Sequence, residues 1–134
     1  MAPRPSLIDS LPFAKRSGID LADGDATPER VVGRVAWTTD GCTTGGVLHG
    51  GLVMTLADTT GAVCAFLNLP EGAAGTTTIE SKTNFLRAVR EGSSAIAESV
   101  PLHVGRTTIL VETKVRDDDG KLVAVTTQTQ AVLR

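Results

Sequence analysis

One aspartate and one glycine pair are the residues of this sequence best suited to chemistry. Asp58 lies in the middle of the longest apolar segment, and ionised carboxylates are rarely buried without a partner or a function. His49, Gly50 and Gly51 open that segment, and glycines let a ligand approach free backbone N–H groups closely. Together with the helix dipole, such groups stabilise the negative charge that develops on a carbonyl oxygen under attack. The pattern predicts chemistry at a carbonyl carbon, with Asp58 as the reactive carboxylate.

Each of these residues also has a purely structural interpretation. Asp58 could bond to local backbone or to a threonine hydroxyl, and the two glycines could simply allow a tight entry into a helix. A lone histidine such as His49 is more often structural than catalytic. These alternatives stay open on the sequence alone.

The spacing of Asp58 and Gly50 limits how the two residues can cooperate. Asp58 lies eight residues after Gly50, which is about 12 Å along a helix axis. A carbonyl held at Gly50 would be out of reach of Asp58 in the same chain, because catalytic contacts need roughly 3 Å. Two such helices running antiparallel would bring Asp58 of one chain toward Gly50 of the other. The spacing therefore predicts two composite sites in a twofold dimer.

The segment that carries these residues is predicted to be a long central helix over residues 49–69. Its apolar residues occur on all sides, which is typical of a buried helix, and Asp58 and several threonines disfavour a membrane span. The helix face around Asp58 is expected to carry small residues that leave room for a ligand or another helix: Gly51, Met54, Thr55, Gly61, Ala62 and Ala65. The other side is expected to pack on a sheet through Leu52, Leu56, Val63 and Phe66.

The rest of the chain is predicted to be mostly β-structure within one domain, residues 1–134. A short helical segment is expected within residues 1–20, and residues 30–38, rich in valine, predict a first strand. Four antiparallel strands should follow within residues 76–133, at 76–86, 93–104, 106–116 and 122–133. The turn Asp117–Gly120 should join the last two strands in a hairpin. The predicted fold class is α+β, with the sheet wrapped around the central helix.

The composition narrows the class of protein. Thirteen Lys and Arg stand against fifteen Asp and Glu, so no basic surface predicts binding to nucleic acid or to a membrane. Two cysteines and two histidines predict neither a disulfide framework nor a metal site. Cys64, in the apolar helix, should behave as a small hydrophobe instead of a nucleophile, and nothing in the spacing of Cys42 supports that role either. Residues 1–16 contain no apolar run typical of a secretory signal, so a cytoplasmic protein is expected.

Several short motifs occur in an order that resembles a known family. They are Leu48–Gly51, Leu56–Asp58, Thr83–Arg87, Val104–Arg106 and Gly120–Ala124. From about Leu11 to Leu133 the chain resembles the PaaI-like acyl-CoA thioesterases of phenylacetate degradation, which belong to the hotdog superfamily. The resemblance implies a hotdog fold and hydrolysis of an acyl-CoA thioester to the free acid and coenzyme A. It implies no metal and no dissociable cofactor, because coenzyme A is part of the substrate.

The resemblance also implies a role for each residue of the site. Asp58 would activate water or attack directly, the Gly50 N–H would polarise the carbonyl across a dimer interface, and His49 would hold the thioester end. Thr43 stands where several relatives have a loop asparagine that helps to place the water. Thr78, with its neighbour Thr77 as the alternative, would assist the acid from the strand after the helix. Further substrate contacts are expected from Gly51, Thr44 and Thr77.

Basic residues after the helix are candidates to bind the phosphates of coenzyme A. Lys82, Arg87, Arg90 and Arg106 form a stretch with more bases than acids. Arginine suits phosphate oxygens because its donors form a fork, although each of these residues could equally be a solvated surface charge. The resemblance favours self-association, as a homodimer or as a homotetramer built from two dimers.

Two other functions are compatible with the same residues. A hotdog dehydratase acting on hydroxyacyl thioesters would pair His49 with an acid, so replacing His49 would abolish its activity. A non-catalytic dimeric acyl-CoA-binding protein would keep the pocket without turnover. The sequence does not name the acyl group, although many small side chains leave space for an aryl or a medium-length alkyl group. Whether coenzyme A or an acyl carrier protein bears the thioester also stays open.

Overall fold

The structure, a computed structural model, describes residues 6–134. Its N-terminal part holds a single 3₁₀ turn at Leu7–Ser10 and the five-residue helix α1 (Pro12–Arg16). Pro12 occupies the first position of α1, where its missing N–H costs no helical hydrogen bond. The helical segment predicted within residues 1–20 is therefore two short pieces, and its residues 1–5 lie outside the described part. Two further 3₁₀ turns lie at Asp23–Asp25 and Thr39–Gly41.

The strands of the described chain form one antiparallel sheet in the order β1-β2-β4-β5-β6-β3. Their bounds are β1 (Ile19–Asp20), β2 (Val31–Ala36), β3 (Gly75–Phe85), β4 (Ser94–Val104), β5 (Thr108–Arg116) and β6 (Leu122–Leu133). The four strands predicted after residue 75 all form, with ends within two residues of the expected ones, whereas β1 was not predicted. The turn Asp117–Gly120 joins β5 and β6 in the expected hairpin.

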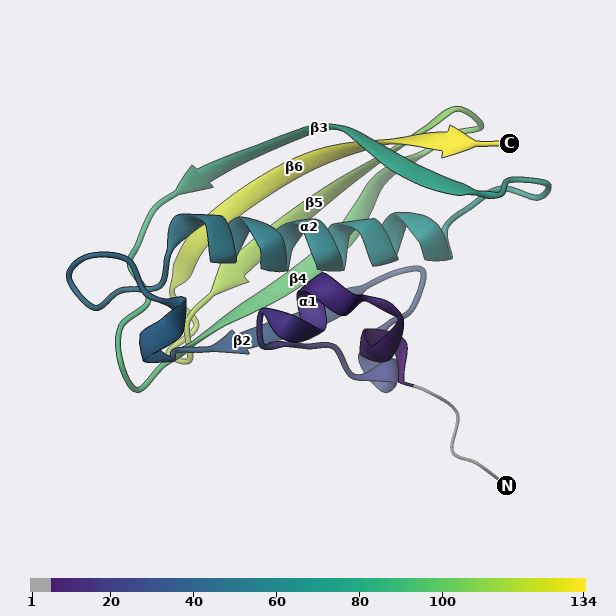
Figure 1. Cartoon of the computed structure of the whole chain (residues 1–134). Helices are drawn as coiled ribbons and strands as arrows, with labels where there is room; N and C mark the ends of the chain where they lie inside the picture. The colour runs from purple at the N-terminus through teal and green to yellow at the C-terminus, as the bar shows by residue number, and fades with distance from the viewer. Residues whose placement is uncertain (1–5) are drawn as a thin grey trace, which may run out of the picture.

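The helix α2 (Gly50–Leu67) lies across the concave face of this curled sheet (Figure 1). It begins one residue after the predicted range 49–69 starts and ends two residues before that range does. It contacts β2, β3, β4, β5 and β6, and its residues Val53, Leu56 and Cys64 are buried in the core. In length and apolar composition α2 would also suit a membrane span, but here it is the core helix of the sheet. One sheet wrapped around one long helix confirms the predicted α+β architecture.

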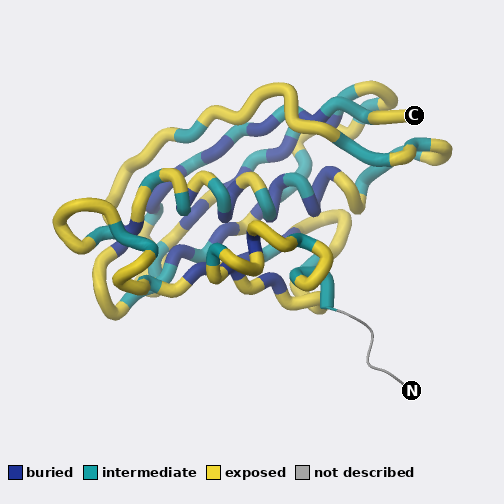
Figure 2. The backbone as a smooth tube through the Cα atoms, in the orientation of Figure 1, coloured by how far each residue is buried: buried dark blue, intermediate teal, exposed yellow. Residues whose placement is uncertain are grey.

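Only one side of α2 is buried in this chain (Figure 2). The buried residues recur as the pairs 56–57, 60–61 and 64–65, which is a stripe of helical period. Gly61 and Ala65 belong to this stripe, because the sheet approaches the helix closely there, while Phe66 is 57% exposed. The predicted division of α2 into a sheet side and an open side is confirmed, with Leu56 buried and Met54 exposed. The placing of Phe66 on the sheet side and of Gly61 and Ala65 on the open side is wrong.

β3 is an open edge of the sheet. Most of its eleven residues are exposed, including the apolar side chains of Ile79 and Phe85, which are 61% and 51% exposed. Met54 and Phe66 add apolar surface on the exposed side of α2. A long edge strand with exposed apolar residues is a surface on which another chain can pair.

Candidate active site

Asp58 projects from the exposed side of α2 and is held by a side chain of β6. The Nε2 of Gln128 donates a hydrogen bond of 2.6 Å to Oδ1 of Asp58. The prediction of a buried Asp58 is wrong for the single chain, in which this residue is exposed. Its hydrogen bond goes to an amide from a distant strand, 70 residues along the chain, and not to local backbone or to a threonine hydroxyl. The carboxylate is thus oriented by the tertiary structure and open on its other side.

Thr78, the residue of β3 to which the family resemblance gave a role, lies beside Asp58, because both side chains bond to Nε2 of Gln128. Its Oγ1 accepts hydrogen bonds from Nε2 of Gln130 at 2.6 Å and from Nε2 of Gln128 at 3.2 Å. A hydroxyl has two acceptor positions and one proton, so Thr78 is left as a donor toward the open side. β3 has an irregularity between Thr78 and Glu80, and such bulges often redirect a side chain next to a site. Thr77, the alternative residue on this strand, forms no hydrogen bond with Asp58 or the two glutamines.

Sequence reasoning missed Gln128 and Gln130, the two residues that connect Asp58 to Thr78. Both are buried, with exposed fractions of 0% and 1%. A signal was present: the second half of β6 runs Thr126-Thr127-Gln128-Thr129-Gln130, so either face of the strand is polar. A strand that turns amide and hydroxyl side chains toward a core is unusual, because buried polar groups need hydrogen-bond partners. That polar run indicated a site on β6.

At the N-terminus of α2 the Gly51 N–H is already bonded, whereas the Gly50 N–H is free in the described chain. Nδ1 of His49 accepts a hydrogen bond of 2.8 Å from the Gly51 N–H, which makes His49 the cap of the helix. Within the described residues, the Gly50 N–H makes no hydrogen bond. The ring of Phe85 lies over Gly50, so close that a methyl group there would be 3.3 Å from Cζ. Gly50, and not Gly51, therefore offers the donor that a developing oxyanion needs.

The bonding of His49 also fixes its tautomer. Because Nδ1 accepts a hydrogen bond, the proton of the neutral ring is on Nε2. The side chain is exposed, so Nε2–H can donate to a bound molecule. His49 is consequently arranged as a hydrogen-bond donor and as a helix cap, and taking up a second proton at Nδ1 would break the cap.

The loop before α2 carries Thr43 and Thr44, which are both exposed. The loop is closed by a hydrogen bond of 2.9 Å from the Thr43 N–H to the Val47 carbonyl, and Nε1 of Trp37 donates to the Gly46 carbonyl at 2.9 Å. Neither threonine side chain bonds to Asp58 or Thr78. The structure thus places these two residues with the Gly50 end of α2 instead of the Asp58 cluster.

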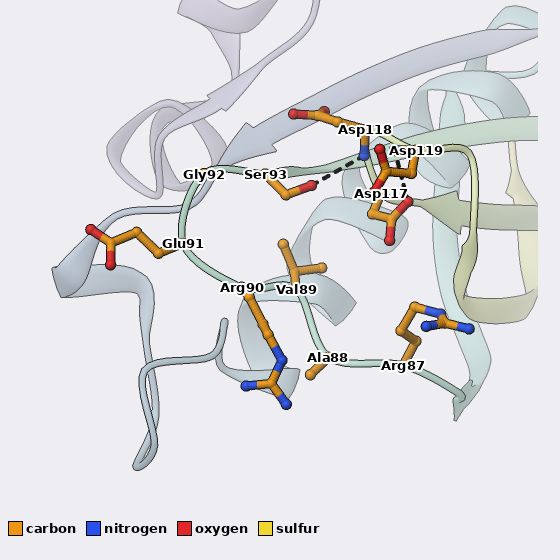
Figure 3. Close-up of a pocket in the computed structure, with 10 residues that line it drawn as sticks. All are labelled: Arg87, Ala88, Val89, Arg90, Glu91, Gly92, Ser93, Asp117, Asp118 and Asp119. Carbon is orange, nitrogen blue, oxygen red and sulfur yellow. Dashed lines mark hydrogen bonds between the residues drawn. The ribbon is translucent and has the colours of Figure 1, made fainter.

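The arginines predicted to bind phosphate do not form one surface in this chain. Arg87 and Arg90 line a cavity of about 420 Å³ between the 87–93 loop and the Asp117–Asp119 turn (Figure 3). That loop touches the segment before α2, because the Leu48 N–H donates to the Val89 carbonyl at 3.0 Å. Arg106 instead lies in a hollow with Pro70, Glu71, Thr107 and Arg134, past the other end of the helix. Arg87 and Arg90 are therefore near Gly50, and Arg106 is not.

A family model matches this chain over residues 45–124, which include α2, β3, β4 and β5, and its description is "Thioesterase superfamily". The chain belongs to the thioesterase superfamily. The match covers more than half of the chain and contains Gly50, Asp58 and Thr78. The family resemblance of the motifs is thereby confirmed.

Curated relatives of this thioesterase-superfamily chain include a hydrolase and several proteins named as putative esterases. A protein named "Putative esterase" from Vibrio cholerae is 37% identical over 89 residues, which are 66% of this chain and 58% of that protein. The 1,4-dihydroxy-2-naphthoyl-CoA hydrolase of Escherichia coli is 32% identical over 88 residues, 66% of this chain and 63% of that enzyme. The matched segment thus spans about three-fifths of the length of each of these relatives.

Solved structures of the superfamily have the same fold. A thioesterase from Haemophilus influenzae superposes with a TM-score of 0.82 at 26% identity, over 91% of this chain and 82% of that one. The PaaI protein from the phenylacetic acid degradation operon of Escherichia coli gives a TM-score of 0.81 at 21% identity, over 96% and 88%. The predicted hotdog fold is confirmed.

The cysteines of this thioesterase-superfamily chain are not arranged for nucleophilic chemistry. Cys64 is buried on the sheet side of α2, and this burial raises the pKa of its thiol to about 11. A thiol with that pKa stays protonated near neutral pH, and the thiolate is the nucleophilic form.

Within residues 6–134, no three His, Cys, Asp or Glu side chains gather as they would to hold a metal ion.

Proposed function

We propose that this protein hydrolyses an acyl-CoA thioester to a carboxylic acid and free coenzyme A, with Asp58 as the catalytic carboxylate. The observation that carries the proposal is the hydrogen bond of 2.6 Å that holds Asp58 open to solvent beside Thr78 in a chain of the thioesterase superfamily. Hydrolysis of a thioester needs a base or a nucleophile and a donor for the oxyanion. Asp58 and the Gly50 N–H are groups of these two kinds.

The proposed reaction begins with a water molecule between Asp58 and Thr78. Thr78, whose acceptor positions are filled, donates to the oxygen of the water, and the free Oδ2 of Asp58 accepts one of its protons. The water oxygen attacks the carbonyl carbon, and the Gly50 N–H stabilises the oxyanion. The carbon–sulfur bond then breaks, and the thiolate leaves and takes up a proton. Direct attack by Asp58, followed by hydrolysis of the anhydride, uses the same parts.

A second copy of the chain supplies the other half of each site in this proposal. Asp58 and Gly50 are eight residues apart on one helix, about 12 Å along its axis. The open edge of β3 and the exposed side of α2 with Met54 and Phe66 form a continuous surface for a twofold partner. Packing two copies there would place Asp58 of each chain toward Gly50 of the other. A tetramer of two such dimers stays a prediction from the family resemblance.

Arg87 and Arg90 are proposed to contact the phosphates of coenzyme A. They lie beside the segment that leads to Gly50, where the thioester would be held, and Arg90 points away from the three aspartates of the neighbouring turn (Figure 3). The acyl group would extend in the other direction, toward the interface between the two copies. A cytoplasmic location remains the prediction made from the sequence.

The arrangement of His49 favours hydrolysis over the dehydratase alternative. A dehydratase would use His49 as a base, but Nδ1 is occupied by the Gly51 N–H and Nε2 carries the proton. In the proposed reaction Nε2–H donates to the thioester end of the substrate. Replacing His49 by alanine should therefore weaken the reaction without abolishing it.

Thiol release from a panel of acyl-CoA substrates, aryl and alkyl, tests the proposal. We expect wild type to release thiol, and Asp58→Ala and Asp58→Asn to lower kcat about 10²- to 10⁴-fold, as loss of a general base or nucleophile does. His49→Ala should lower kcat by a smaller factor. Binding of every acyl-CoA without any turnover would instead identify a non-catalytic binding protein. Conversion of a hydroxyacyl-CoA to an enoyl-CoA without thiol release, abolished in His49→Ala, would identify the dehydratase.

Mixing two inactive variants tests the shared site. Gly50→Pro removes the N–H at the first helical position. The extended His49 backbone before it (φ −62°, ψ 132°) suits a following proline, and the Phe85 ring over Gly50 has to shift slightly to admit the added atoms. In a heterodimer of Gly50→Pro and Asp58→Ala chains, one of the two sites has both groups intact. Co-expression should therefore restore about a quarter of wild-type activity if dimers form at random. No recovery, with heterodimers demonstrated by mass spectrometry, would refute a site shared between chains.

A further inference from the structure

Gln128 has the environment of a residue retained for function at a cost to stability. Its side chain is 0% exposed, and its Oε1 is the one buried side-chain N or O atom without a hydrogen-bond partner in the described chain. A buried carbonyl without a donor lowers stability, so an apolar side chain of the same size would give a more stable protein. What the amide provides instead is its two N–H groups, which bind Asp58 and Thr78.

The orientation of this amide is determined by its neighbours. If the amide were reversed, Oε1 would face the carboxylate oxygen of Asp58 and the Thr78 hydroxyl oxygen, which already accepts from Gln130. The carboxylate accepts hydrogen bonds only, so Nε2 must face it. The acceptor atom is then forced toward α2, where it meets no donor.

Gly61 makes room for the amide on the helix side. A methyl group at position 61 would overlap Oε1 of Gln128 and contact its amide carbon, at 3.2 Å. The backbone of Gly61 has an ordinary helical conformation, so its glycine is required by this contact and not by backbone strain. A glycine in the middle of a helix is less stable than an alanine there. Two residues that lower stability, Gly61 and Gln128, are thus both needed for the hydrogen bond from Gln128 to Asp58.

We propose that Gln128 is the positioning residue of the site: it fixes Oδ1 of Asp58, so that Oδ2 faces the substrate, and sets Thr78 as a donor toward the same point. This inference rests on the proposed function of Asp58. Gln128 itself touches neither water nor substrate, and it acts through the orientation of the two side chains that do. Removing its N–H groups should therefore lower the rate of the bound complex more than its affinity.

Steady-state thiol release by Gln128→Leu and Gln128→Met tests the proposal. Both replacements keep the approximate size of the side chain and remove the two donors, and the flexible Met guards against a packing failure of Leu. We expect kcat to fall about 10- to 100-fold with KM within about twofold, and the melting temperature to stay equal or rise. The matched control is Thr126→Val, an inward residue of the same strand that bonds to Thr83 and not to Asp58. It should keep wild-type kcat.

A double-mutant cycle separates positioning from a structural role. If Gln128 acts through Asp58, adding Gln128→Leu to the Asp58→Ala variant should change its residual kcat less than twofold. The same Gln128→Leu substitution should lower the kcat of the wild-type protein 10-fold or more. Equal losses in both backgrounds would overturn the proposal. A kcat equal to that of wild type in both Gln128 variants would also overturn the proposal. The proposed function would still stand in that case if the Asp58→Ala variant is inactive. If wild type itself releases no thiol, the proposed function fails and this inference fails with it.

Discussion

β5 and β6 are neighbours in the sheet and both turn a row of side chains toward α2, but the two rows differ in chemistry. The inward row of β5 is mostly apolar: Ile109, Val111, Thr113 and Val115. The inward row in the second half of β6 is polar: Thr126, Gln128 and Gln130. Every one of these residues is 1% exposed or less.

The difference between the two rows shows which strand stabilises the protein and which one builds its site. Apolar side chains buried under the helix contribute by their removal from water, whatever they touch. Buried polar side chains cost free energy unless they are bonded, and those of β6 are bonded only toward β3 and Asp58. The polar row thus follows the open edge of the sheet, where the proposed reaction takes place.

The largest expected effect is on stability, from truncation of the apolar row. Ile109→Ala should lower the free energy of unfolding by about 2–5 kcal/mol, because Ile109 is fully buried and its loss leaves a cavity. Urea denaturation measures this change. Thiol release per folded molecule should stay near that of wild type, and a large loss of kcat in folded protein would erase the distinction between the two rows.

A smaller change in stability, opposite in sign to the change expected from helix propensity, is expected at the contact between α2 and the polar row of β6. Gly61→Ala should lower the free energy of unfolding by about 1–3 kcal/mol, because the new methyl group overlaps the amide of Gln128. Helix propensity alone predicts a gain of roughly 1 kcal/mol. Denaturation together with thiol release measures both consequences, since a displaced amide should also lower kcat. A stabilised, fully active Gly61→Ala protein would show that the close contact is not real.

The one polar residue in the apolar row allows a third test. Thr113 and Ser99 are both fully buried and share a hydrogen bond of 2.6 Å between their hydroxyls. Thr113→Val should cost about 1–2 kcal/mol of unfolding free energy, because it leaves the Ser99 hydroxyl without its partner. The double variant with Ser99→Ala should recover most of that loss. Simple additivity of the two changes would mean that the hydroxyls do not depend on each other.

The smallest effect concerns the thiols, and it tests the apolar side of α2 next to β5. Cys64 is buried, and its raised pKa of about 11 keeps the thiol protonated at pH 8, so it should not react with Ellman's reagent until the protein unfolds. Cys42 is only partly buried and should react first. Cys42→Ser serves as the control, because it should abolish the early phase. Rapid reaction of Cys64 in the folded protein would show that the sheet side of the helix opens.

Local patterns in the sequence determined most elements of this protein and part of its proposed site. The length and apolar content of residues 49–69 gave α2, and the turn Asp117–Gly120 with the alternation around it gave the β5–β6 hairpin. The same patterns selected Asp58 and Gly50 as residues for chemistry, and their spacing showed that the two residues of one helix cannot meet, whereas Thr78 came from the family resemblance. These features depend on helical rise and strand period, which are properties of the backbone and repeat along any chain.

Only the tertiary structure decided which side of α2 is open and what holds Asp58. A helix that is apolar on all sides does not show from its sequence where the sheet-covered face ends, so Gly61 and Ala65 were placed on the open face with Asp58, although the sheet buries them. The bond from Gln128 to Asp58 joins residues 70 positions apart and depends on the register of β6 against β3 and on the space beside Gly61. The polar run of β6 marks Gln128 as unusual but does not name its partner, because two distant segments come together only when the whole sheet has closed around the helix.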